Sequence, residues 1–193
     1  MRAYLKFLIL LIFLVSSATQ AAPMPGTSTS ALVKPELGIF HSKYGYEISA
    51  GGTGWLQSDT AIDQKFVEAL YRSPKSATDN STDKSTDKEG PATLTVRVDK
   101  MEKETTLDRY IQRWLKEYPK YGFDVLGSKS FMQNKAHGYV VDLVNRDQQK
   151  QLRQVVFMKK QVAIILTCRD QTKSFDVSRK NCNSIIRTFK WIE

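Results

Sequence analysis

Cysteine and histidine are scarce in this sequence, with two of each among 193 residues. Such low counts exclude a small scaffold held by many disulfides and a multi-ligand Cys/His zinc site. The motifs G-x-S-x-G, H-E-x-x-H and C-x-x-C are absent, so no common nucleophilic or metal-dependent centre is indicated. We therefore expect no enzyme, no cofactor, and no catalytic or metal-binding residue.

The sequence also lacks an apolar run of the roughly 20 residues that a membrane-spanning helix needs. Its longest run, Phe7 to Val15, follows the basic residues Arg2 and Lys6 and precedes small and polar residues that end at Ala21. This order is typical of a secretory signal peptide. We predict cleavage after residue 21 and export to the periplasm or the medium as a soluble protein. The alternative is an uncleaved N-terminal anchor.

Apolar residues make up 41% of the chain and charged residues 25%, which is ordinary for a globular protein. The length predicts a single domain, which we place at residues 37–193 after a flexible lead-in at 22–36. Residues 73–90 carry a tandem STDK element and almost no apolar side chain. A segment of this kind cannot bury enough surface to become ordered, so we expect a mobile loop there.

Strand patterns dominate the domain. Residues 92–99 alternate, with Leu94, Val96 and Val98 on one face and polar residues on the other, as in a half-buried strand. The short loops between later strands predict antiparallel pairing, and the apolar run Val162 to Leu166 predicts a central strand buried on both faces. The later strands are expected at 123–133, 138–145, 153–159 and 162–168. Earlier strands are expected as a pair within 38–50 and at 66–71, where a helix is the alternative.

Two helices complete the pattern. The first begins after Thr105 or Thr106 and runs to about Tyr118, with apolar residues at helical spacing. The second spans residues 175–189, with Ser178 or Asp176 as its N-terminal cap. An antiparallel sheet with a buried central strand needs cover on both faces. We therefore predict an α+β fold, an α/β/α sandwich around a central antiparallel sheet.

These segments resemble those of PsbP-like domains. The strand Tyr44-Gly45-Tyr46-Glu47-Ile48 leads to a Gly54-Trp55 turn, as at the start of such domains. Later segments follow the same order: 137–139, 153–156, 162–167 and 188–190. The chain is similar over residues 38–193 to the superfamily of the photosystem II extrinsic protein PsbP, the Ran-binding Mog-type proteins and bacterial periplasmic DcrB-like proteins.

The resemblance implies a PsbP-like α/β/α sandwich and a non-enzymatic role, because members mostly bind or stabilise protein partners. It carries over no catalytic residue. This chain departs from the bacterial lipoproteins of the superfamily in having no Cys near the cleavage site, and the STDK loop is a further departure. We therefore do not assign the partner of any superfamily member to this chain.

The two cysteines, Cys168 and Cys182, form one possible pair in an oxidising compartment. Cys168 ends a predicted strand and Cys182 lies in the helix that returns over it, so a disulfide is expected. The alternative is two buried free thiols. His137 is expected in a turn, and neither it nor His41 has a motif for catalysis. The Gly51-Gly52-Thr53-Gly54 segment lacks the lysine of a phosphate loop, so we read it as a turn.

Basic residues outnumber acidic ones by 29 to 20, a formal charge of +9. Eight of them form the candidate basic surface: Arg109, Arg113, Lys116, Lys120, Lys173, Arg179, Lys180 and Arg187. They suggest a docking surface for an acidic protein or, alternatively, for anionic lipid, or else an ordinary solvated surface. Nucleic acid is not expected, since no binding motif is present. We predict an exported binding or assembly factor. The alternatives are a secreted effector or adhesin with a basic face, and a small hydrolase with an unrecognised site.

Overall fold

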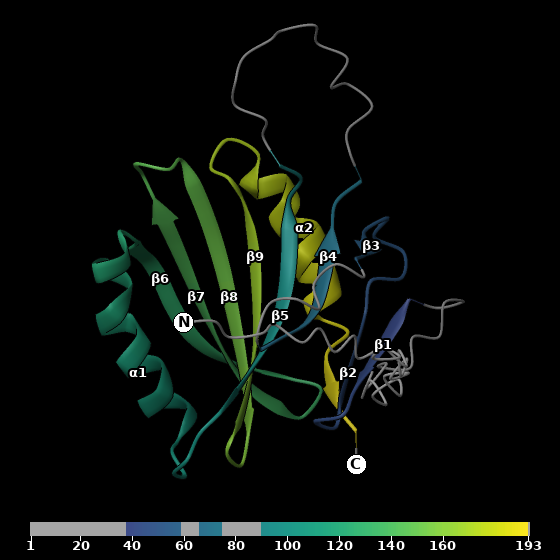
Figure 1. The fold of residues 1–193 in the computed structure, drawn as a ribbon, viewed down its shortest axis with the longest axis vertical. Helices are drawn as coiled ribbons and strands as arrows, with labels where there is room; N and C mark the ends of the chain where they lie inside the picture. The colour runs from purple at the N-terminus through teal and green to yellow at the C-terminus, as the bar shows by residue number, and fades with distance from the viewer. Residues whose placement is uncertain (1–37, 59–65, 75–89, 193) are drawn as a thin grey trace, which may run out of the picture.

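The computed structural model describes residues 38–58, 66–74 and 90–192. The predicted signal peptide, the lead-in and all but the ends of the STDK loop lie outside the described residues. The remaining chain forms two sheets and two α-helices (Figure 1).

A seven-stranded antiparallel sheet is the centre of the fold, with strand order β3-β4-β5-β9-β8-β7-β6. Its strands are β3 (Leu56–Gln57), β4 (Val67–Arg72), β5 (Thr93–Lys100), β6 (Asp124–Gln133), β7 (Ala136–Asn145), β8 (Lys150–Lys159) and β9 (Val162–Gln171). The central strand is β9, and Ala163, Ile164, Ile165 and Leu166 are all buried, as the apolar run predicted. The predicted strand at 66–71 is confirmed as β4, and the helical alternative is wrong.

Strands β6 to β9 form a meander of hairpins. Asn134 and Lys135 between β6 and β7, and Lys160 between β8 and β9, adopt positive φ angles of 47°, 62° and 55°. Turns of this hand match the twist of the flanking strands. Strand β8 begins at Lys150, three residues before the predicted start, because its first residues pair with the end of β7.

A smaller sheet packs beside the large one. It has the order β1-β2-β10 and contains β1 (Ile39–Ser42), β2 (Tyr46–Ser49) and β10 (Lys190–Trp191). The first two strands confirm the predicted N-terminal pair, whereas β10 was not predicted. Glu68 of β4 connects the two sheets, because its Oε2 accepts hydrogen bonds from the Ser42 and Tyr46 hydroxyls at 2.5 and 2.9 Å. Burial of Tyr46 and the nearby Glu68 carboxylate raise the pKa of this hydroxyl, so it stays a donor.

The first helix, α1 (Leu107–Glu117), matches the prediction. Thr106 caps it by accepting a hydrogen bond from the Arg109 amide at 3.3 Å. A short 3-10 helix, η2 (Tyr118–Tyr121), follows and ends at Gly122, whose φ is 76°.

The second helix, α2 (Phe175–Ile186), ends three residues earlier than predicted, because Phe189 turns into the core and Lys190 joins β10. The predicted caps are also wrong. Ser174 occupies the capping position, but its hydroxyl donates to the Gln171 carbonyl at 3.3 Å and does not cap the helix. The Ser178 hydroxyl donates to Asp170 at 2.5 Å.

The elements form three layers (Figure 1). One face of the large sheet packs on α2 and the small sheet, in a core centred on Tyr46, Phe157 and Phe189. The apolar residues that pack the other face against α1 come from β7, β8 and β9. The fold is therefore an α/β/α sandwich in which the described residues cover the α1 side of the large sheet only in part.

Candidate functional site

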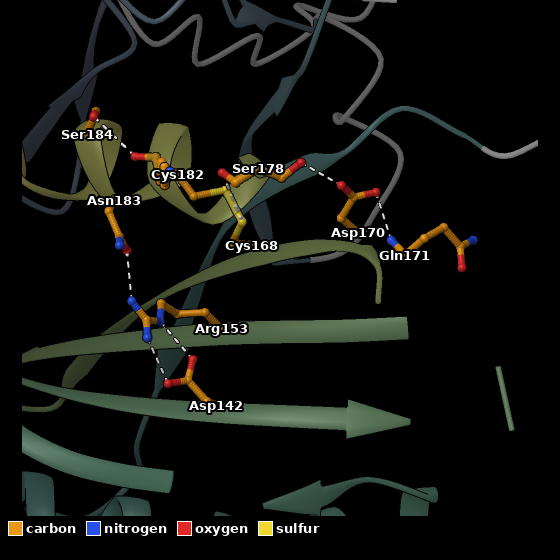
Figure 2. Close-up of a disulfide and its surroundings, with 10 residues drawn as sticks. Asp142, Arg153, Cys168, Asp170, Gln171, Ser178, Cys182, Asn183 and Ser184 are labelled. Carbon is orange, nitrogen blue, oxygen red and sulfur yellow. Dashed lines mark hydrogen bonds and ion pairs between the residues drawn. A yellow bond between two sulfur atoms is a disulfide. The ribbon is translucent and has the colours of Figure 1, made fainter. Parts of the chain in front are cut away.

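Cys168 and Cys182 form a disulfide, with their Cα atoms 6.0 Å apart. Both residues are fully buried, and the bond joins the central strand β9 to α2 (Figure 2). The Ser178 to Asp170 hydrogen bond lies beside it and joins the same two elements. Cross-linking positions 14 residues apart stabilises the fold by roughly 3 kcal/mol in the chain-entropy model. The buried pair holds the core together and offers no exposed thiol.

Arg153 makes a second connection to α2 near the disulfide. Its guanidinium donates to both carboxylate oxygens of Asp142 on β7, at 2.7 and 2.8 Å, and to Asn183 of α2 at 3.2 Å (Figure 2). The side chains of Arg153 and Asp142 are 17% and 26% exposed, so this pair is less screened than a surface pair. All three nitrogens of the guanidinium are thus engaged within the chain, and Arg153 acts as a structural link between β7, β8 and α2.

The two histidines lie in different sheets. His41 in β1 faces Glu47 in β2, with Nδ1 3.4 Å from Oε2. His137 is exposed in the second position of β7 rather than in the turn itself, and pairs with Met132. Residues 38–58, 66–74 and 90–192 contain no cluster of three or more His, Cys, Asp or Glu side chains that could hold a metal ion.

The glycine-rich segment forms a turn, as predicted. Gly52 and Gly54 adopt φ angles of 78° and 72°, which side-chain-bearing residues rarely do. The Thr53 hydroxyl donates to the Ala50 carbonyl at 2.6 Å and fixes the turn before the buried Trp55. A short strand follows in place of the helix that a phosphate loop requires.

The candidate basic surface divides between opposite sides of the sheet. Arg109, Arg113, Lys116 and Lys120 lie on or just after α1, and Lys173, Arg179, Lys180 and Arg187 lie on or beside α2. Several already interact within the chain. Arg113 stacks over the Tyr110 ring at 5.3 Å, Lys120 pairs with Glu117 at 2.8 Å and Arg179 pairs with Asp176 at 2.8 Å. The eight residues are therefore two groups, and no single surface contains them all.

A third group of basic residues lies on the part of the sheet that α1 leaves open. Strand registers place Arg72 of β4, Thr93 of β5 and Arg169 of β9 side by side in one row. Paired residues point to the same side of a sheet, and Arg169 also pairs with Leu152, which packs against α1. Arg97 lies four residues along β5 on the same face. We call Arg72, Arg97 and Arg169 the arginine cluster.

All three arginines are exposed, and their guanidinium groups make no ion pair or hydrogen bond to any described residue. Arg72 and Arg169 flank Thr93 at about two strand spacings, or roughly 10 Å, and Arg97 lies about 13 Å further along the strand. Thr95 and Thr167 are paired between them and form a polar floor. Among the described residues, the cluster thus forms an open cationic face that extends about four residues along β5.

Acidic side chains are nearly absent from this face. Glu68 and Asp170 point to the opposite side, where they bond Ser42, Tyr46 and Ser178. Asp99 shares the face but accepts a hydrogen bond from the Tyr110 hydroxyl at 2.9 Å. Nothing in the described strands neutralises the cluster, so it attracts anions.

A small cavity of about 60 Å³ lies at the junction of the cluster with α1. Arg97, Trp114, Tyr118 and Gln154 supply its polar groups, and Tyr110, Val156 and Ile165 complete the lining. Tyr110, Trp114 and Tyr118 follow one another at successive turns of the helix, with neighbouring ring centroids 6.4 and 6.1 Å apart. The aromatic side of α1 therefore forms one wall and the sheet forms the floor.

The chain resembles solved structures in fold. It matches the solution structure of cyanobacterial PsbP (CyanoP) from Synechocystis sp. PCC 6803 with a TM-score of 0.54 and 12% identity, covering 89% of this chain and 98% of that one. It matches PA94 from Pseudomonas aeruginosa, described as a protein of unknown function and putative regulator, with a TM-score of 0.53 and 13% identity, covering 79% and 94%. No family model and no curated protein matches the sequence.

The fold is therefore PsbP-like, as the sequence resemblance indicated. At these identities the match establishes architecture alone. Among the described residues, no helix combines the length and apolar character needed to cross a membrane. The arginine cluster was missed in the sequence, although Arg97 stands on the polar side of the alternating strand 92–99. Only the strand register brings it together with Arg72 and Arg169.

Proposed function

We propose that this protein is an exported, non-enzymatic binding or assembly factor that holds an acidic segment of a partner protein on the open face of its sheet. The unpaired arginine cluster is the observation that carries this proposal. Three cations without counter-ions among the described residues give this face a positive potential, which favours association with an anionic partner. The PsbP-like fold and the N-terminal signal-like segment support the non-enzymatic role and the export.

A protein partner suits this face better than a lipid bilayer. Thr93, Thr95 and Thr167 between the arginines are partly buried, small and polar. The apolar side chains registered among them are the partly buried Leu70 and, at the sheet edge beside Arg72, Leu56, which is 69% exposed. One exposed leucine is a small apolar contribution beside three arginines. Interfacial membrane binding relies on large apolar side chains that enter the headgroup region. An extended acidic segment needs only a cationic face of matching length, which the cluster provides.

Capture of partners from an envelope extract by the immobilised mature protein tests the proposal. Arg72→Glu/Arg169→Glu reverses two charges on the open face, and Lys180→Glu/Arg187→Glu makes the same change in charge on the α2 side. Proteins retained by the wild type and the α2-side variant, but lost from the open-face variant and at 0.3 M salt, would support it. Equal retention by all three, or binding only to phosphatidylglycerol vesicles, would contradict it.

A further inference from the structure

We infer that the cavity between α1 and the sheet is an anchor site for one carboxylate of the acidic partner. This inference rests on the proposed function and deepens it by assigning a recognition site. The polar atoms around the cavity that lack partners are all hydrogen-bond donors. A cavity of this kind is completed by an acceptor with negative charge.

Trp114 supplies the first donor. Its Nε1 atom is buried without a hydrogen-bond partner in the described structure. Burial and the Asp99 carboxylate raise the pKa of the Tyr110 hydroxyl, and the nearby indole N–H opposes this rise only in part. The indole N–H does not reach hydrogen-bonding geometry with that hydroxyl. That hydroxyl donates to Asp99 instead. A buried N–H without an acceptor costs about 1–3 kcal/mol in mutational measurements, so an incoming oxygen atom recovers this loss.

Gln154 and Arg97 supply the others. The side-chain Oε1 of Gln154 accepts a hydrogen bond from the Tyr118 hydroxyl at 2.5 Å, so its amide nitrogen is left as a donor. Burial raises the pKa of Tyr118 to about 12, so this hydroxyl stays neutral and supplies no negative charge. Arg97 lines the same cavity and makes no ion pair to the described residues. Its planar fork suits a carboxylate.

Size and position favour a carboxylate at the end of a side chain. A volume of about 60 Å³ exceeds what a single water needs and accommodates the three heavy atoms of a carboxylate group. From this anchor, the Arg72 and Arg169 row lies about 13 Å away along β5, which is four residues of extended chain. An acidic peptide with one carboxylate in the cavity therefore places others beside these two arginines.

The test uses N-acetyl hexaglutamate amide as the probe and hexaglutamine as its uncharged control. Binding is measured by calorimetry and by the indole N–H resonances in the NMR spectrum, with Trp114→Phe identifying the resonance of Trp114. We expect hexaglutamate, but not hexaglutamine, to shift that resonance. Arg97→Gln should weaken binding at least about tenfold, whereas Arg109→Gln on the outer side of α1 should change it less than about twofold.

The possible outcomes distinguish a carboxylate anchor in the cavity from binding to the arginine cluster alone. If the Trp114 resonance stays in place at saturation and Arg97→Gln binds like the wild type, while Arg72→Gln/Arg169→Gln weakens binding, the anchor is overturned and the proposed function stands. If the wild type does not bind hexaglutamate, both the carboxylate anchor and the proposed binding of an acidic partner are refuted. A shift of the same resonance by inorganic phosphate at equal concentration would overturn the assignment to a carboxylate.

Discussion

Gly138 of β7 lies where there is no room for a side chain. A Cβ atom at this position would come within 2.6 Å of Phe131 Cζ and 2.8 Å of Phe157 Cε1. Phe157 is fully buried and stacks on Phe189 with ring centroids 4.0 Å apart, so it has nowhere to move. Phe131 is only partly buried and can swing outward. Gly138→Ala therefore forces a rearrangement at the centre of the larger core.

Overpacking of this kind costs about 1–3 kcal/mol. We expect about 2 kcal/mol for Gly138→Ala, because one of the two rings can relax and the other cannot. With a urea m-value of about 1.5 kcal/mol/M, this corresponds to a midpoint lower by about 1.3 M. The assay is urea unfolding followed by circular dichroism, with the disulfide kept oxidised in every sample.

Gly127→Ala in the neighbouring strand β6 is the matched control. A Cβ atom there meets nothing within 4 Å, so the same chemical change should be neutral or stabilise by up to about 1 kcal/mol. The reasoning is refuted if Gly138→Ala is as stable as the wild type, or if the two variants lose stability equally.

Two further predictions concern the disulfide and the pH dependence of stability. Replacing Cys168 and Cys182 together by alanine should lower the free energy of unfolding by about 3 kcal/mol, and a wild type whose urea midpoint is insensitive to dithiothreitol would contradict the bond. Burial raises the pKa of Tyr118 to about 12, against about 10 in an unfolded chain. The stabilisation from its neutral hydroxyl is therefore complete below pH 10 and is lost as the pH rises towards 12. Urea titrations should show a shallower decline for Tyr118→Phe than for the wild type over this range, and identical slopes would argue against the shift.

Local patterns in the sequence were sufficient for most elements of the fold. The alternation of residues 92–99 and the unbroken apolar run from Val162 predicted β5 and the central β9, because side-chain periodicity is a local property. The end of α2 was not predicted, since Phe189 has helical spacing. It leaves the helix to stack on Phe157, a tertiary contact that no local pattern contains.

The candidate site was less accessible from the sequence for the same reason. Helical spacing grouped Arg109, Arg113 and Lys116 on α1, because these residues are close in the chain. Arg72, Arg97 and Arg169 are distant in the chain and become neighbours only through the pairing of β4, β5 and β9. Trp114 fitted the apolar stripe of its helix, and its unpartnered N–H became visible only in the packed structure.

The small sheet has a consequence for biosynthesis. Its last strand, β10, pairs with β2, and the Thr188 hydroxyl accepts from the Ser49 amide across a separation of 139 residues. Because β10 follows every other described strand in the chain, β2 lacks its second neighbour until these residues have been synthesised. Long-range pairing of this kind is slow to form. The small sheet therefore closes late in folding, after the strands of the large sheet are already available to pair.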